Sequence, residues 1–180
     1  CERTPPLQQA WFEASAIQHC ASPNWRGFAT VNSRRLGEEL RQDVFSVDNL
    51  PLVLRALIRG RLDRDLYVSQ HSYSRRHRRT VDLLTLNCGH IDLDIYKHDS
   101  WRGRPIDDVV HAVLRRLDQH GIPLPSYVVH SGRGLQVKWL WSEPLSPKAL
   151  IRWQVAHRFL VNQVLPDFQA DITAILPTQL

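Results

Sequence analysis

Two hydrophobic periodicities divide the chain near residue 63. Before this point apolar residues recur at intervals of three and four, which is the spacing of one face of an α-helix. The spacing predicts three helices, over residues 7–17, Ser33–Gln42 and Asp48–Arg59. Asp48 is the expected N-cap of the third helix. We therefore expect residues 1–62 to form an N-terminal accessory helical part.

From Asp65 onward apolar and polar residues alternate, as is typical of β-strands. The pattern predicts two strands and a following turn, at Leu66–Ser69, Val81–Leu86 and Asn87–Gly89. The next strand, Ile91–Ile95, carries two acidic residues, Asp92 and Asp94. Because successive side chains of a strand point to opposite faces, the two carboxylates project from the same face.

Helix and strand patterns follow one another in the remainder of the chain. An amphipathic helix begins at Pro105, and an apolar strand follows over Ser126–His130. A strand, a helix and a strand in this order form a crossover, so we expect the Ile91–Ile95 and Ser126–His130 strands to be parallel. The chain then continues as a hairpin turn, a returning strand and a long helix, at Ser131–Gly134, Leu135–Trp141 and Ser146–Leu165. Residues 63–180 are thus predicted to be α+β, a mixed or antiparallel sheet with packed helices.

Charge favours a polyanionic partner. The net charge is +5, and 20 of the 23 basic residues are arginine. The densest run holds four of them, which we expect to contact DNA or triphosphate: Arg75, Arg76, Arg78 and Arg79. A solvated loop is the alternative interpretation of such a run.

The cysteines, the apolar runs and the lack of methionine bear on the cellular compartment and on whether the sequence is a segment of a longer one. The three cysteines have neither disulfide-framework nor zinc-finger spacing, which favours a reducing cytoplasm. No apolar run is long enough to span a membrane, so no membrane partner is expected. The sequence contains no methionine, so we expect it to be an excised or processed segment of something longer.

The paired carboxylates are the main chemical signal. At roughly 5 Å and an effective dielectric near 20, two such charges repel by on the order of 3 kcal/mol. A hard divalent cation such as Mg²⁺ or Mn²⁺ would relieve this repulsion, since such ions take oxygen ligands, and would bring a triphosphate with it. Asp171 is the best candidate for a third acidic ligand. The alternatives are a solvated strand face for the pair and a helix cap for Asp171.

The hairpin supplies groups that suit phosphate binding. Backbone N–H groups of Ser131, Gly132 and Gly134 could cradle phosphate oxygens, with charge added by Arg133 and Lys138. Gln136 and Lys138 share a strand face that should look toward the carboxylates. Trp139 and Trp141 lie on the opposite, apolar face and are expected in the core, whereas Tyr96 is the aromatic expected to touch nucleotide or template.

This set of motifs resembles the archaeo-eukaryotic primase superfamily, in particular the RepB-type replication primases of plasmids and phages. The resemblance runs from about Tyr67 through Asp171 and rests on the Asp92/Asp94 strand, the crossover helix, the Ser-Gly-x-Gly hairpin and the later aspartate. The stretches Tyr67–Tyr73, Arg78–Arg79 and Ile122–Ser126 are similar to that family as well.

The resemblance implies a palm built on an RNA-recognition-motif-like sheet, which makes primers from nucleoside triphosphates on single-stranded DNA with Mg²⁺ or Mn²⁺. It places Asp92 and Asp94 on the first acidic motif and Asp171 on the third. The middle motif commonly ends in a nucleotide-contacting histidine, but Gln136 stands at that position here, and His130 could supply an imidazole instead. The Arg-hydrophobic-Pro-Gly run that usually follows the third motif would lie beyond Leu180, and other domains or replication proteins are expected partners.

Two other functions compete with a primase. A non-catalytic single-stranded-DNA-binding domain on the same fold would bind DNA without needing Mg²⁺ or nucleotides. A rolling-circle nickase can share a similar sheet, but it needs a His-hydrophobe-His metal pair that this sequence lacks.

Overall fold

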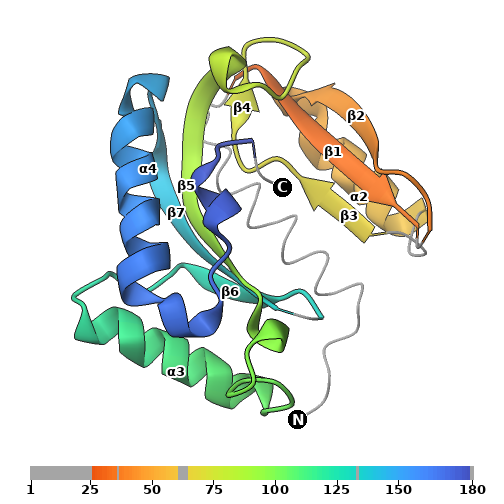
Figure 1. Ribbon diagram of the computed structural model, residues 1–180. Coiled ribbons are helices and arrows are strands. Elements are labelled where there is room, and N and C mark those ends of the chain that lie inside the picture. Colours follow the sequence, from red (N-terminus) through yellow and green to blue (C-terminus); the bar gives the residue numbers. More distant parts are fainter. Residues whose placement is uncertain (1–25, 36, 61–64, 133, 179–180) are drawn as a thin grey trace. The chain divides into compact units, whose positions relative to one another are not determined.

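The computed structural model describes residues 26–178 apart from 36, 61–64 and 133. The helix predicted over residues 7–17 and the candidate site residue Arg133 lie outside this part of the chain. Among the described residues the fold is α+β, with three α-helices and seven strands in an antiparallel arrangement (Figure 1). None of the described helices is both long and apolar enough to cross a membrane.

The chain divides into two compact units. The first runs up to Asn87 and includes Ser142–Pro147 and the residues from Pro177 onward, and the second comprises Cys88–Trp141 and Lys148–Leu176. Strand β5 (Leu83–Leu93) contributes residues to both units. The boundary expected at residue 62 remains a prediction.

The first unit begins with an antiparallel hairpin. Strands β1 (Phe28–Arg34) and β2 (Arg41–Ser46) pair from Phe28↔Ser46 to Ser33↔Arg41. The helix predicted over Ser33–Gln42 is therefore wrong. Gly37 adopts a φ of +86° between the two strands, a conformation that suits a tight turn and cannot continue an α-helix.

The next helix follows the sequence pattern. Helix α2 (Leu50–Gly60) begins two residues later than expected and buries Leu50 and Leu54 against Ala29, Val31 and Val47. The predicted N-cap, Asp48, lies instead in a preceding 3-10 turn and accepts a hydrogen bond from the Ser46 hydroxyl at 3.3 Å.

The strands of the first unit bury several polar side chains. Strand β3 (Asp65–Val68) pairs with β1, and the short strand β4 (Ser72–Tyr73) pairs with β1 and with β5. The buried polar side chains are Thr30, Asn32, Ser33, Ser69, His71, Ser72, Asp82 and Asn87. Several of them bond to one another, as where the Asn32 amide donates to the Thr30 hydroxyl at 3.3 Å.

Strand β5 runs without a break through the predicted turn at Asn87–Gly89, so that turn is wrong. Cys88 is buried, and its carbonyl accepts a hydrogen bond from the Trp153 indole at 3.0 Å. Gly89 lies against Trp139 and His157, where an added Cβ would make ordinary van der Waals contacts at 3.7 Å. Asn-Cys-Gly has a turn composition, but neighbouring strands and side chains hold it extended.

Strand β7 (Leu135–Leu145), which belongs to the second unit as far as Trp141, lies between β5 and β6 (Tyr127–His130). It pairs antiparallel with β6 from Tyr127↔Lys138 to His130↔Leu135. Figure 1 shows β7 running opposite to both neighbours, so β5 and β6 share one direction, as the crossover predicts, but do not pair directly.

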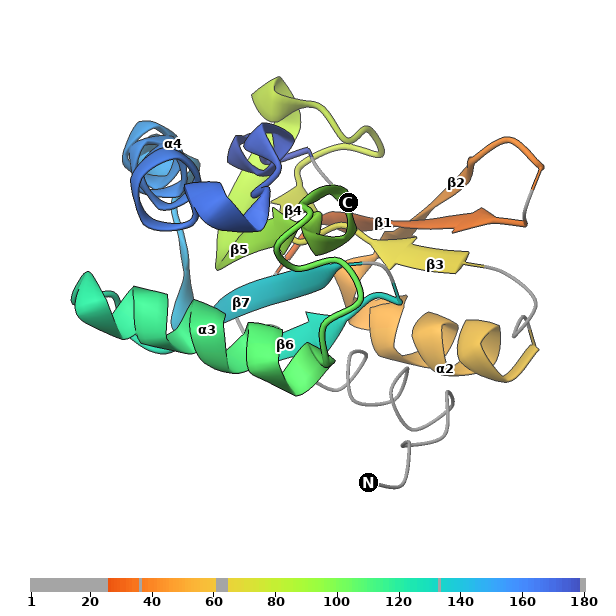
Figure 2. The ribbon, with the colours of Figure 1, turned by 60° about the horizontal axis from the view of Figure 1, so that its bottom comes forward.

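Helices cover one face of this part of the sheet. Helix α3 (Ile106–Gln119) runs alongside β6 and β7 (Figure 2). It buries Val109, Val113 and Leu117 in the predicted stripe, in one core with residues of β5 and β7. Helix α4 (Leu150–Phe159) and the π-turn Leu160–Val164 occupy the predicted Ser146–Leu165 helix, and the π-turn packs on the same core. The opposite face of the strands carries the polar residues Asp92, Gln136 and Lys138.

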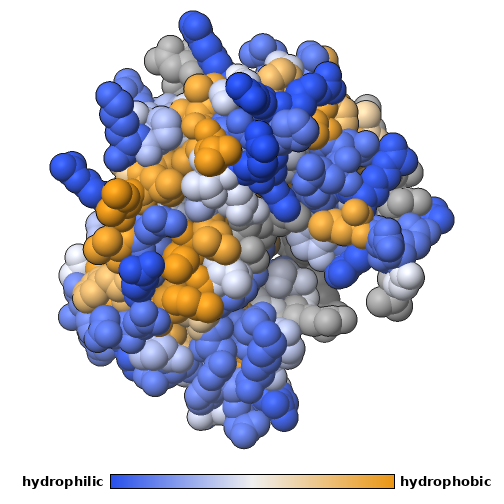
Figure 3. Space-filling model, turned by 45° about the horizontal axis from the view of Figure 1, so that its top comes forward, coloured by the Kyte–Doolittle hydropathy of each residue, from blue (hydrophilic) through white to orange (hydrophobic). Residues whose placement is uncertain are grey.

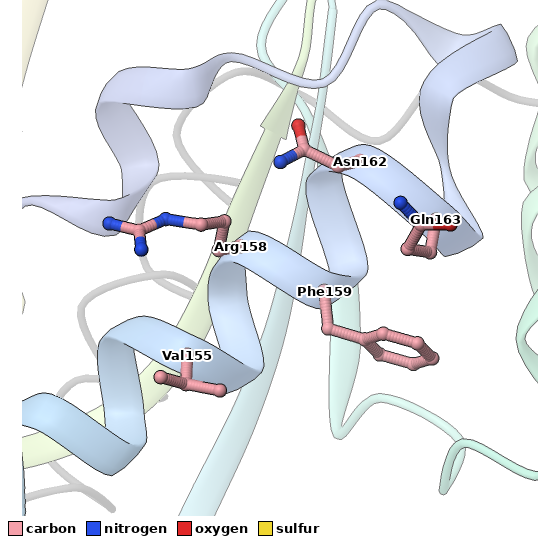
Figure 4. Close-up of a pocket in the computed structure, with 5 residues that line it drawn as sticks. All are labelled: Val155, Arg158, Phe159, Asn162 and Gln163. Atoms are coloured by element: carbon pink, nitrogen blue, oxygen red, sulfur yellow. The ribbon is translucent and has the colours of Figure 1, made fainter.

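The outer side of α4 is apolar as well. Its exposed residues Ile151, Val155 and Phe159 are spaced four apart. Figure 3 shows hydrophobic side chains gathered on the left of the molecule, the side on which α4 lies in Figure 1. A shallow depression of 260 Å³ beside this stripe is lined by Val155, Arg158, Phe159, Asn162 and Gln163, and includes none of the predicted site residues (Figure 4).

His157 joins α4 to the sheet as a neutral, buried imidazole. Its Nε2 accepts from the His90 backbone N–H at 3.1 Å, so its Nδ1 donates to the Trp153 carbonyl at 2.8 Å. Burial lowers the pKa of His157 to about 4. The unfolded chain therefore binds the proton more readily than the folded protein between pH 4 and 6.5.

We expect the free energy of unfolding to fall as the pH is lowered through this window, by up to about 3 kcal/mol from His157 alone. His157→Gln should flatten this part of the pH profile, as measured by urea unfolding at several pH values. The exposed His120→Gln is the control and should leave the profile unchanged. An unaltered slope in His157→Gln would contradict the assignment.

Candidate functional site

Asp92 and Asp94 lie at the carboxyl end of β5. The apolar residues that alternate with them, Ile91, Leu93 and Ile95, are all buried, whereas the two aspartates are partly exposed. The predicted alternation is therefore confirmed. Asp94 comes directly after the last residue of the strand, where the backbone turns away with φ −80° and ψ 52°.

The segment around Asp171 pairs with this strand end. Leu93 and Ala170 form an antiparallel bridge flanked by two backbone hydrogen bonds. The Asp171 N–H donates to the Asp92 carbonyl at 2.8 Å, and the Asp94 N–H donates to the Gln169 carbonyl at 3.0 Å. The third predicted acidic residue is thus held beside the first two by backbone geometry.

Electrostatics link the three carboxylates. Burial, followed by repulsion from Asp94 and Asp171, raises the pKa of Asp92 to about 6, while Lys138 acts in the opposite direction. Burial and neighbouring negative charge both keep the proton on this carboxyl group, and the charge component is one that a cation would offset.

Two of the carboxylates also have local partners. Asp94 forms an ion pair with Lys97, three residues further on. Asp171 accepts from the Thr173 N–H at 2.8 Å and from the Thr173 hydroxyl at 2.6 Å, so it caps the 3-10 turn Ile172–Ile175. The cap interpretation of Asp171 is confirmed, and it coexists with the residue's place beside Asp92.

The three acidic residues can also be considered as metal ligands. Within the part of the chain that the structure describes, no three His, Cys, Asp or Glu side chains converge as the ligands of a metal ion. The oxygen-only donor set of Asp92, Asp94 and Asp171 nevertheless has the chemistry that Mg²⁺ and Mn²⁺ prefer.

The Ser131–Gly134 hairpin packs directly on the aspartate strand. A Cβ on Gly134 would lie 2.4 Å from the Leu93 carbonyl oxygen and 3.7 Å from Asp94 Cα, so only glycine fits. The Gly134 N–H donates to the Ser131 hydroxyl at 3.2 Å and is therefore engaged within the turn. Gly132 adopts a φ of +92° with open space around it.

The β7 residues separate into a buried cation and a partly exposed amide. Lys138 is 1% exposed, with its ammonium 5.9 Å from the Tyr127 ring centroid. It stands beside Asp92 as a fixed internal positive charge, which does not suit the predicted contact with a nucleotide. Gln136 is partly exposed on the same face, and His130 is exposed at the end of β6.

The arginine run belongs to the first unit, where several of its side chains bond to other residues of the protein. Arg75 and Arg79 lie 3.9 and 2.7 Å from the buried Asp82 carboxylate. Arg76 donates to the Val44 carbonyl at 3.1 Å, and Arg78 is partly buried, which lowers its pKa. The contact of this run with DNA stays a prediction.

Sequence reasoning overlooked one residue of the site, Lys97. It lies three residues after Asp94, its ammonium is 5.4 Å from the ring centroid of Tyr96, and Tyr96 is 39% exposed. The Asp-x-x-Lys spacing was the available signal, because residues three apart in a helical turn face each other.

The chain is similar to a curated protein named "Replication protein" from Clostridium perfringens, with 33% identity over 118 residues. The alignment covers 66% of this chain and 28% of that relative, so the chain spans less than a third of the relative's length. No family model matches the sequence, and no solved structure matches it.

Neutralising Asp92 tests the electrostatic description. Because the pKa of Asp92 is raised, the folded protein holds its proton up to about pH 6, and this carboxyl makes folding less favourable as the pH rises from 3.8 to 6. We expect Asp92→Asn to remove that loss, so that its stability relative to wild type increases across the window. Thermal unfolding from pH 4 to 8 measures this, with the exposed Asp118→Asn as the control.

The close approach of the hairpin can be tested at its glycines. Gly134→Ala should destabilise the protein by about 2 kcal/mol or more, because the new methyl group meets backbone atoms that cannot move aside alone. Gly132→Ala, which introduces strain at positive φ but no contact, should cost about 1 kcal/mol. Equal losses in urea unfolding would show that Gly134 is not crowded.

Proposed function

We propose that the chain is the catalytic palm of a primase, which joins nucleotides on a single-stranded DNA template in a reaction that depends on Mg²⁺ or Mn²⁺. The observation that carries this proposal is the bridge between the two acidic segments, in which Asp171 is hydrogen-bonded through its backbone to Asp92. This pairing brings acidic residues from distant parts of the sequence to one strand end.

The acidic residues would hold the metal ions. When bound, such ions neutralise and orient the phosphate oxygens of the nucleotide and acidify the attacking hydroxyl. Asp92 fits this role because, in addition to its burial, the charges of Asp94 and Asp171 raise its pKa, and a cation would offset those charges. Asp94 and Asp171 would exchange their contacts with Lys97 and Thr173 for the metal.

Other residues of the second unit would position the nucleotide. Gln136 lies partly exposed on the face that also carries Asp92, and its amide can donate a hydrogen bond to a phosphate or sugar oxygen without carrying charge. Gly134 lets the hairpin approach the aspartate backbone, which fixes the wall of the site. Lys138 limits the net negative charge around Asp92 from inside the protein.

The similarity to the Clostridium perfringens protein supports a role in replication. In this proposal, the arginine run of the first unit and Tyr96 of the second contact the template DNA.

Primer synthesis on single-stranded DNA tests the function. Wild type with Mn²⁺ and labelled ribo- or deoxynucleotides should yield short products, and Asp92→Asn or Asp94→Asn should lower the rate by about 100-fold or more. Asp118→Asn should retain the wild-type rate, and circular dichroism should confirm that all variants are folded.

Equal synthesis by wild type and the aspartate variants would overturn the catalytic assignment. DNA binding that falls steeply with salt but does not respond to Mn²⁺ or nucleotides, without any synthesis, would favour the alternative of a non-catalytic single-stranded-DNA-binding domain.

A further inference from the structure

Lysine is rare in this chain, and its placement is uneven. Only three of the 23 basic residues are lysines, at positions 97, 138 and 148. Lys97 forms an ion pair with Asp94, and the charge of Lys138 acts on Asp92. Two of the three lysines thus accompany the paired aspartates, in a protein whose other basic residues, apart from Lys148, are all arginine.

The two lysines differ in their access to solvent. Lys138 is 1% exposed, so its ammonium is a permanent part of the interior. The Lys97 side chain is 53% exposed, and its partner Asp94 is 26% exposed at the side chain. An ion pair as open as this one contributes little to stability and can exchange partners at little cost.

The backbone holds the base of the Lys97 side chain in place. Ile95 is buried, and the Lys97 N–H donates to the Asp94 carbonyl at 2.8 Å, which closes the 3-10 turn Ile95–Lys97. The side chain of Arg102, five residues after Lys97, donates a hydrogen bond to the Tyr96 carbonyl at 3.1 Å. The flexible part of Lys97 is therefore its aliphatic stem, which starts from a fixed point beside Asp94.

We propose that Lys97 is an exchangeable counter-cation that binds the triphosphate of the incoming nucleotide. It pairs with Asp94 while no divalent cation is present. When the cation takes the Asp94 carboxylate, the Lys97 ammonium moves to a phosphate oxygen of the nucleotide that arrives with the metal. This inference rests on the proposed function and adds a nucleotide-binding residue to it.

The choice of lysine over arginine suits an exchange. A guanidinium binds a carboxylate through two parallel hydrogen bonds and would compete with a metal for Asp94. An ammonium is a single point charge on a flexible stem, so it can leave Asp94 and follow a phosphate.

The test compares two binding measurements on the full chain. Binding of Mn²⁺ alone is followed by the electron paramagnetic resonance of the free ion, and binding of ATP or dATP in saturating Mn²⁺ is followed by calorimetry. Lys97→Ala should bind Mn²⁺ about two- to fivefold more tightly, since a competitor for Asp94 is gone. The same variant should bind the triphosphate about tenfold more weakly.

Two further variants sharpen the result. Lys97→Arg should bind Mn²⁺ several-fold more weakly than wild type, because the guanidinium grips Asp94. Lys148→Ala removes the remaining lysine, which lies outside the acidic site in the turn Pro147–Ala149, and should leave both affinities unchanged. Opposite shifts in the two affinities cannot arise from partial unfolding, which would weaken both.

The outcomes separate the two proposals. If wild type binds Mn²⁺ and triphosphate, and Lys97→Ala binds triphosphate equally well or Mn²⁺ more weakly, the role of Lys97 is overturned while the proposed function stands. If neither wild type nor Asp92→Asn binds Mn²⁺ or the triphosphate, both proposals are overturned.

Discussion

Repulsion of Asp92 by Asp94 and Asp171 is the constraint around which the second unit is arranged. A strand end that gathers three carboxylates loses free energy unless positive charge or hydrogen-bond donors stand close by. The chain supplies a buried ammonium at Lys138, an exposed one at Lys97, and the donors of Thr173. Burial is the largest cause of the raised pKa of Asp92, and repulsion from Asp94 and Asp171 adds to it. A cation bound here, as we propose, would offset the repulsion that remains.

The local sequence pattern was sufficient to predict an element where one physical preference dominated. The alternation at Ile91–Ile95 and the stripe of α3 follow from burying one face, so their positions were predictable. The stretch Ser33–Gln42 failed because its helical spacing is weak, whereas pairing with neighbouring strands and the positive φ of Gly37 are strong. Asn87–Gly89 failed for the same reason, since contacts from His71, Trp153 and His157 hold a turn-like sequence extended.

The site shows a similar division. The acidic residues could be named from sequence because their chemistry and spacing are distinctive, and their backbone pairing agrees with that grouping. The burial of Lys138 could not be predicted, because it depends on which residues pack over one strand face. The contact between Gly134 and Leu93 could not be predicted either, because the need for glycine depends on how closely the neighbouring backbone approaches.

The bridge between Leu93 and Ala170 gives the site an order of assembly. During synthesis the aspartate strand leaves the ribosome long before the segment that carries Asp171, and contacts between distant parts of a chain form late in folding. Until that segment arrives, the Asp94 N–H lacks its native partner on Gln169, and the third carboxylate is absent. A nascent or prematurely ended chain would therefore carry the acidic pair without a complete site. The acidic site would be complete only once the segment that carries Asp171 is in place.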